Sequence, residues 1–143
     1  MKCRVTLANR CYFGLNKKLS SRNLSRATKL ALHKALILPV LLYGAEAWTL
    51  SSIDAAALGE FERKVLLKIF CPLRVGDDYR IRTNRELYEL FNDMDVAKRI
   101  NKQRLRWLGH VVRMDEDAPP RGFFDAVIGK HRRQGRQRTR WQD

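Results

Sequence analysis

The chain has 143 residues, of which 45% are hydrophobic and 31% charged, a composition typical of one globular domain with a substantial core. A disordered chain is excluded, and no apolar stretch approaches the roughly 18 residues that a membrane span needs. The formal net charge of +14, from 29 Lys and Arg against 15 Asp and Glu, indicates a polyanionic partner.

The positive charge is concentrated toward both ends of the chain. Residues 1–50 carry 9 basic and 1 acidic side chains, residues 51–95 carry 7 and 9, and residues 96–143 carry 13 and 5. An anionic membrane surface would match this charge, but no segment combines a basic face with a broad face of Trp, Phe and Leu. We therefore expect RNA, DNA or an RNA–DNA hybrid as the partner, and no membrane.

The cysteines predict a reducing compartment. There are three, Cys3, Cys11 and Cys71, widely spaced and without a C-x-x-C pair. The first residues show no secretory signal, so we expect an intracellular protein of the nucleus or cytoplasm. Combined with the three histidines, His33, His110 and His131, the cysteines fit no zinc-site spacing, and no cofactor is expected.

The N-terminal fifty residues predict two helices. Apolar residues at intervals of three and four mark an amphipathic first helix: Val5, Ala8, Cys11 or Tyr12, Leu15 and Leu19. Ser25 is suited to cap a second helix, in which Pro39 predicts a kink. Gly44 then suits a left-handed helix end.

The middle of the chain predicts two more helices separated by a loop. Ser51 or Ser52 begins a third helix, whose buried stripe is Leu58, Phe61, Val65 and Ile69. The Pro, Gly and paired Asp of residues 71–83 predict a loop, and no hairpin is expected there. Thr83 with Glu86 forms a capping box before a short fourth helix.

A fifth helix is predicted from a cap at Asp93 or Asp95 to about Arg113. Its inward residues are Val96, Ile100, Trp107 or Leu108, and Val111. The acids and prolines of residues 115–120 end it, and a short helix around residues 121–127 ends at Gly129. The predicted fold is all-α: a small bundle of about five to six helices over residues 1–129, with a flexible basic tail over residues 130–143.

Two basic segments are candidates for binding nucleic acid. On the fifth helix, intervals of three and four place five side chains on one face: Arg99, Lys102, Arg106, His110 and Arg113. The tail adds Lys130, Arg132, Arg133, Arg136, Arg138 and Arg140. Long basic side chains in such a row can follow a phosphate backbone; the alternative is a solvated helix face.

The residues of the sequence give little support for a catalytic site. His110 has no carboxylate partner that its spacing nominates, and Trp107 is expected in the core, with base stacking as a minor alternative. Asp77 and Asp78 resemble a metal-binding pair, but a glycine-containing segment without a flanking apolar strand favours an exposed turn. No nucleophile with a nearby base and no glycine-rich phosphate loop is present.

Several phrases in order carry a family resemblance: "ALILPVLLYGAEAWTL", "EFERKVLLKIF", "TNRELYEL", "RLRWLGHVVRMDEDAPPRG" and the basic "GKHRRQGRQRTRWQD". The chain resembles, over nearly its whole length, the C-terminal part of non-LTR (LINE-type) retrotransposon reverse transcriptases. The region resembled is the helical thumb and the connector that follows it, which help to hold template and primer.

The resemblance implies nucleic-acid contacts without catalysis. The family's palm, with its Phe/Tyr-x-Asp-Asp motif and another metal-binding aspartate, precedes this region and has no counterpart here. By the resemblance, Arg99, Lys102, Arg106 and Arg113 face nucleic acid, while Tyr43, Gly44 and Trp48 are structural. We expect a non-catalytic fragment of a mobile element's reading frame, with the missing palm portion as a further partner. The alternative is an inert relic or a protein-interaction module with exposed apolar surface.

Overall fold

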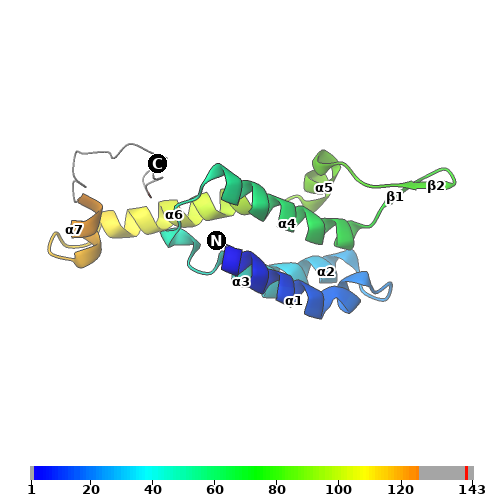
Figure 1. The fold of residues 1–143 in the computed structure, drawn as a ribbon, viewed down its shortest axis with the longest axis horizontal. Helices are drawn as coiled ribbons and strands as arrows, with labels where there is room; N and C mark the ends of the chain where they lie inside the picture. Colours follow the sequence, from blue (N-terminus) through cyan, green and yellow to red (C-terminus); the bar gives the residue numbers. More distant parts are fainter. Residues whose placement is uncertain (1, 126–140, 142–143) are drawn as a thin grey trace.

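The computed structural model describes residues 2–125 and Trp141. The predicted all-α architecture is confirmed. Three long helices are α1 (Lys2–Ser20), α4 (Ser52–Phe70) and α6 (Val96–Val112), and a fourth rod consists of α2 (Arg26–Leu32), η1 (His33–Ile37) and α3 (Leu38–Leu42). Shorter elements are η2 (Ala45–Ala47), α5 (Asn84–Phe91) and α7 (Pro119–Asp125). The molecule is elongated, with α7 at one end and, at the other, α5 and the segment 73–80 that projects beyond it (Figure 1).

The core lies where α4 contacts α1, α2, α5 and α6. The main buried cluster draws on α1, η1, α3, η2, α4 and α6: Ala8, Tyr12, Leu19, Ile37, Leu41, Ala45, Leu58, Phe61, Val65, Ile69, Val96 and Ile100. A second cluster joins α4 to α5 through Leu66, Phe70, Leu87 and Phe91. The predicted stripe of α4 is therefore confirmed, and Tyr12 rather than Cys11 is the buried residue of the two.

Where the sequence predicts a kink at Pro39, the α2–η1–α3 rod contains a π-helical turn. Ser25 caps the rod by accepting a hydrogen bond from the Thr28 amide at 3.1 Å. Pro39 has no amide hydrogen, and its ring would clash with the carbonyl four residues earlier. The π-helical turn, η1, ends at Ile37, two residues before the proline. Gly44 then takes a left-handed conformation with φ of 71° after the C-cap Tyr43, as expected.

Side-chain caps begin α4, α5 and α6, and they decide between the predicted cap residues. Ser51 accepts from the Asp54 amide at the start of α4. Thr83 and Glu86 form the predicted capping box of α5. Asp95, not Asp93, caps α6 by accepting from the Lys98 amide at 2.8 Å.

The prediction of a loop over residues 71–83 was wrong, because this segment forms a β-hairpin. Strand β1 (Leu73–Val75) pairs antiparallel with β2 (Asp78–Arg80), and Val75 lies opposite Asp78. Only Gly76 and Asp77 remain to make the turn, with a positive φ of 62° at the glycine alone. Glycine at the first of two turn positions is typical of a type II′ hairpin, and the Gly-Asp pair was a signal for it.

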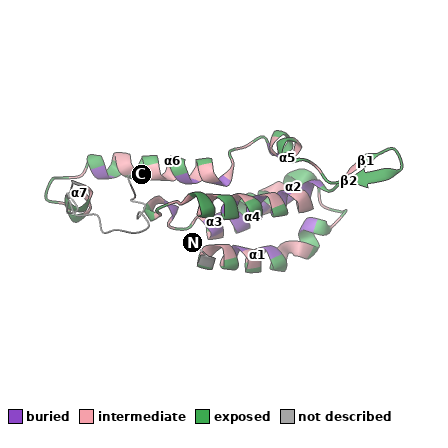
Figure 2. Ribbon diagram, turned by 45° about the horizontal axis from the view of Figure 1, so that its top comes forward, coloured by how far each residue is buried: buried purple, intermediate pink, exposed green. Residues whose placement is uncertain are grey.

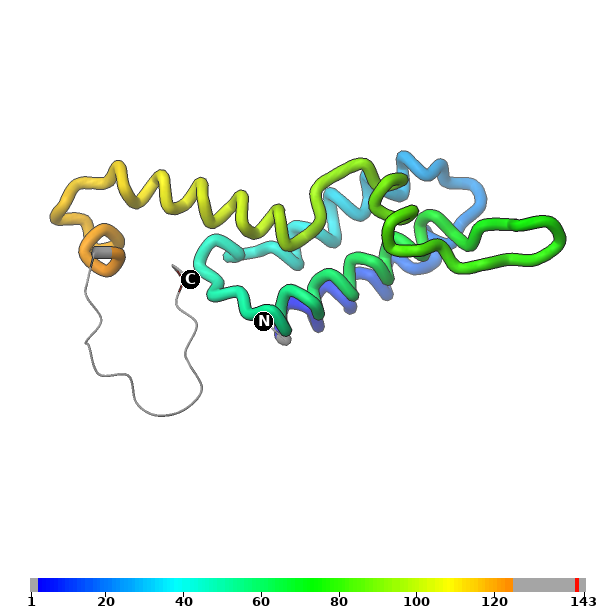
Figure 3. Tube along the Cα trace, turned by 90° about the horizontal axis from the view of Figure 1, so that it is seen from above, coloured from blue at the N-terminus to red at the C-terminus, as the bar shows by residue number. Residues whose placement is uncertain are grey.

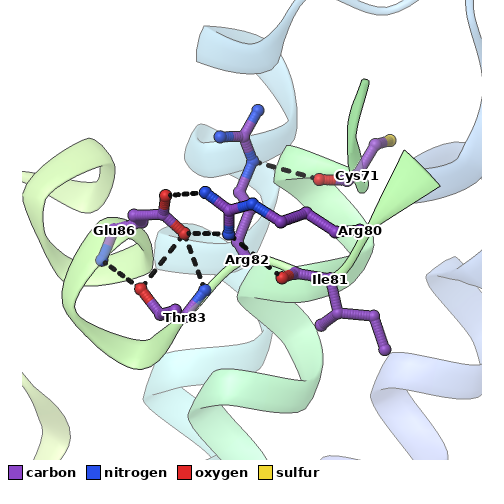
Figure 4. A network of polar contacts seen from close by, with 6 residues as sticks. All are labelled: Cys71, Arg80, Ile81, Arg82, Thr83 and Glu86. Carbon is purple, nitrogen blue, oxygen red and sulfur yellow. Dashed lines mark hydrogen bonds and ion pairs between the residues drawn. The ribbon is translucent and has the colours of Figure 1, made fainter. Parts of the chain in front are cut away.

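The base of the hairpin is fixed to α5 by the polar network of Figure 4. The Arg80 guanidinium donates to both carboxylate oxygens of Glu86, at 2.9 and 2.5 Å, and the Thr83 amide donates to the same carboxylate at 2.8 Å. The hydrogen bond from Arg80 is the main reason that the pKa of Glu86 is lowered to about 2. Arg82 also donates to the carbonyl of Cys71 at 3.1 Å.

The far end of α6 is joined to α7 and to Trp141. Arg121 of α7 donates to the Val112 carbonyl at 3.0 Å. The indole Nε1 of Trp141 donates to the Glu46 carbonyl at 2.6 Å, and the ring contacts Arg104 and Phe124. This residue of the predicted flexible tail is therefore packed against the bundle; residues 126–140, 142 and 143 lie outside the described part of the chain.

Candidate nucleic-acid interface

Helix α6 starts at a buried carboxylate as well as at its cap. Glu62, fully buried on α4, accepts from the Val96 amide and from the Tyr88 hydroxyl, both at 3.1 Å. Together with Asp95, it places two carboxyl groups at the helix N-terminus, where the positive end of the helix dipole favours them. Val96 and Ile100 then enter the core. The first turns of α6 are thereby fixed to α4.

The middle of α6 leaves the core. No residue from Asn101 to His110 is buried, and the next buried side chain is Val111. The reason is geometric: α6 runs beyond α4 toward α7 (Figures 1 and 3), so its later turns contact only short elements, namely η2 and α7, among those described. Exposed and half-buried residues alternate along it in Figure 2.

Four of the five predicted basic residues form what we call the exposed basic face: Lys102, Arg106, His110 and Arg113. All four are solvent-exposed and at intervals of four, four and three. Within the described residues none of them makes an ion pair, and α6 contains no acidic residue. At 1.5 Å per residue the face is about 16 Å long, which matches the axial rise of roughly five nucleotides in one strand of a duplex.

Arg99, the fifth predicted member, is directed elsewhere. Its guanidinium lies 2.6 Å from the Asp93 carboxylate and its Nε donates to the Met94 carbonyl at 3.1 Å, leaving 24% of the side chain exposed. Lys34 also lies 2.5 Å from Asp93. The hydrogen bond from Lys34, with those from the Met94 amide and Arg99, lowers the pKa of Asp93 to about 2. Arg99 therefore stabilises the turn between α5 and α6.

The prediction that Trp107 lies in the core was wrong. Its side chain is 38% exposed, and its ring centroid lies 5.4 Å from that of His110. Leu108, the alternative, is half-buried. The apolar period of α6 points Trp107 toward the bundle side, but the elements that contact this helix leave the indole partly exposed. An exposed indole beside basic side chains is suited to stack on a base.

The acidic, thiol and tail candidates add no further site within the described residues. Asp77 and Asp78 are exposed, as expected, but only Asp77 lies in the turn, since Asp78 is the first residue of β2; Asp77 pairs with Arg74 at 3.5 Å. The three cysteines are free thiols. No group of three or more His, Cys, Asp or Glu side chains in residues 2–125 is placed to hold a metal ion. The six tail candidates, Lys130, Arg132, Arg133, Arg136, Arg138 and Arg140, lie outside the described residues.

Among the buried polar side chains, Glu62 and His33 have shifted pKa values. Burial raises the pKa of Glu62. Burial is also the main reason that the pKa of His33 falls to about 4, with the charges of Arg99 and Lys34 acting in the same direction. Neither ring nitrogen of His33 has a hydrogen-bond partner in the described structure. For Glu62 a signal existed, since it lies four residues after Leu58 and three before Val65, inside the buried stripe.

None of the helices described here is long and apolar enough to span a bilayer. A scan of family models gave no match to this chain, and searches of curated proteins and of solved structures gave none either.

Proposed function

We propose that this chain is a non-catalytic part of a non-LTR retrotransposon reverse transcriptase, an RNA-directed DNA polymerase, and that it binds RNA, DNA or their hybrid without sequence preference. The observation that carries the proposal is the exposed basic face: four basic side chains in a row on a helix without acids, and without ion pairs in the described structure. A phosphate backbone supplies the anions that such a row lacks. The intracellular site of action is the nucleus or the cytoplasm.

Binding through this face is expected to be sequence-tolerant. Lysine and arginine side chains that meet phosphates carry no base information. Helix α6 is also held by backbone and side-chain contacts at both ends, so its cations are presented in a fixed row. The resemblance of the sequence to the thumb and connector supports the same role, which is to hold template and primer. On this proposal the missing palm portion is a second partner and supplies the chemistry.

A salt titration tests the proposal. Each phosphate neutralised contributes about 0.9 to the slope of log affinity against log salt for duplex DNA and about 0.7 for single strands. We expect replacement of Lys102, Arg106 and Arg113 by Ala to reduce the slope by about 2 to 3. The measurement is fluorescence anisotropy of a labelled RNA–DNA hybrid between low and physiological salt.

The matched control removes the same charge elsewhere. Arg10, Lys17 and Lys18 are exposed on α1, and their replacement by Ala also lowers the net charge by three. This control is expected to keep nearly the wild-type slope. Equal slopes for the two triple variants, or absence of binding by the wild-type protein at low salt, would show that the exposed basic face is not the binding surface.

The second candidate is that the chain is a protein-interaction module with uncovered apolar surface, or an inert relic of the element that has no function. The observation in its favour lies on the same helix: Leu105 is 68% exposed and Val112 is 49% exposed. Monomers expose large apolar side chains singly, whereas a contiguous patch marks an interaction surface. Sedimentation at rising protein concentration tests it: a wild-type protein that associates, and a Leu105→Gln/Val112→Gln variant that does not, would support this candidate.

A further inference from the structure

A surface groove lies beside the exposed basic face, between α3 and α6. Its volume is about 450 Å³, within the range of roughly 300–1,000 Å³ that small-molecule sites occupy. Apolar side chains of α3 line one part of it, namely Leu38, Pro39 and Leu42, and Tyr43 continues this wall. Arg99 and Gln103 contribute from α6.

The charges around the groove nearly cancel. Its two cations, Lys34 and Arg99, both lie against the carboxylate of Asp93, at 2.5 and 2.6 Å. Glu46 adds another carboxylate to the lining. A free phosphate would therefore meet cations that already have a partner, so the groove does not suit an anion. Its apolar wall suits a neutral, flat ligand.

The Tyr43 ring and the Gln103 amide indicate which kind of neutral, flat ligand the groove would bind. Tyr43 is 67% exposed and carries the Arg4 guanidinium 4.5 Å from its ring centroid. Gln103 lines the groove, and its side-chain amide makes no hydrogen bond within the described residues, with Oε1 buried and unpaired. Because Oε1 is shielded from solvent, Nε2 is the amide atom that can reach a ligand, and it can donate a hydrogen bond to a nucleobase acceptor such as N7 of adenine.

The groove and the exposed basic face are neighbours on one helix. Gln103 follows Lys102 directly and precedes Arg106 by three residues, which is about 4.5 Å along the helix axis. A strand whose phosphates contact Lys102 and Arg106 therefore passes the mouth of the groove. A duplex keeps its bases paired and stacked, whereas a single strand can turn one base outward.

From this arrangement we infer that the groove binds one unpaired nucleobase of a strand lying on the exposed basic face. The apolar wall and Tyr43 contact the base, and the Gln103 amide hydrogen-bonds to its edge. This inference rests on the proposed function and makes it more specific, because it selects single-stranded nucleic acid. The binding energy of a base in the groove adds to the phosphate contacts without changing the number of phosphates neutralised.

The experiment compares strands of equal charge with and without bases. Fluorescence anisotropy is measured for an oligoadenylate and for an abasic strand of the same length, each across a range of salt. Base contacts of this kind typically contribute fivefold or more in affinity, so we expect the oligoadenylate to bind at least about fivefold more tightly. The two strands should give the same salt slope.

Two variants at one position test the groove itself. Gln103→Leu removes the amide at similar size, and Gln103→Trp fills the groove; both should abolish the preference for the base-bearing strand and keep the salt slope. Asn101→Leu is the control, because it removes an exposed amide from α6 outside the groove. Circular dichroism confirms that each variant is folded.

The outcomes separate the inference from the proposed function. Equal binding of both strands with a normal salt slope would refute the groove and leave the exposed basic face intact. If neither strand binds at low salt, the proposed function fails, and titration with adenosine then tests the groove alone. Nuclear magnetic resonance shifts of the Gln103 side-chain amide at millimolar adenosine would support it, and unchanged shifts would overturn it.

Discussion

The buried histidine gives a stability prediction that the structure quantifies. His33 is fully buried, with Phe91 against its ring and the cations Lys34 and Arg99 nearby. Its pKa falls from 6.5 to about 4 on folding. Because the folded pKa is depressed, the folded protein binds this proton less tightly than the unfolded chain does. The stability linked to His33 is therefore fully present above pH 6.5 and is lost as the pH falls toward 4.

The magnitude follows from the same linkage. Lowering the pH from 7.5 to 4.5 should reduce the free energy of unfolding by roughly 2–3 kcal/mol through His33 alone. His33→Leu removes the titrating group and two unpaired nitrogens, so it should keep the stability at pH 7.5 and lose this part of the acid sensitivity. Glu62, whose pKa is raised, acts in the opposite direction: its contribution is fully present at low pH and is lost as the pH rises.

The assay is urea unfolding of the wild type and of His33→Leu at pH 7.5 and 4.5, followed by circular dichroism. Comparing the two proteins cancels the contribution of Glu62, which both contain. A parallel loss of stability between the two pH values would show that His33 does not titrate as a buried group. A variant unfolded at pH 7.5 would contradict the expectation that Leu fits this position; His33→Gln then provides a second non-titrating replacement.

Two further predictions concern contacts that fix the ends of the molecule. Trp141→Ala removes the hydrogen bond to the Glu46 carbonyl and the contact with Arg104, so thermal unfolding should show a loss of about 1–3 kcal/mol in stability. The control, Trp107→Ala at an exposed site, should change stability by less than about 1 kcal/mol. Equal effects of the two variants would contradict the packing of Trp141. Gly76→Val places a β-branched side chain at a φ of 62° and should destabilise the hairpin, which is measured as faster amide hydrogen exchange of β2. Gly76→Asn should be tolerated, because Asn adopts positive φ more readily. Unchanged exchange in Gly76→Val would rule out strain at this turn.

Local signals predicted the starts of α2, α4, α5 and α6, because each of these four helices follows a residue whose side chain accepts a backbone hydrogen bond. Ser25, Thr83 and the Ser51 and Asp95 alternatives all occur at helix starts. The hairpin was missed because its strands have three residues each and show no alternation in burial, all but Leu73 being exposed. Its only sequence signal was the two-residue turn, which the loop-forming residues around it obscured.

The candidate site was harder to predict, because it depends on what covers α6. Helical periodicity identifies the side of the helix to which Trp107 belongs, but not whether another helix reaches that turn. The ion pair of Arg99 likewise depends on Asp93, which lies six residues earlier in the sequence, and on the placement of Lys34 of η1 beside the same carboxylate. The salt titration is the first test of the proposed nucleic-acid role.

The two ends of α6 explain why its uncovered middle can serve as a surface. At the first turn the buried Glu62 carboxylate holds the Val96 amide, and at the last turn Arg121 holds the Val112 carbonyl. Between them, Arg104 contacts the ring of Trp141. A helix held in this way needs no backbone ordering when it meets a partner, so more of the contact energy remains as affinity. Because the same turns present cations on one side and Leu105 on another, salt dependence rather than affinity alone distinguishes a phosphate backbone from an apolar partner.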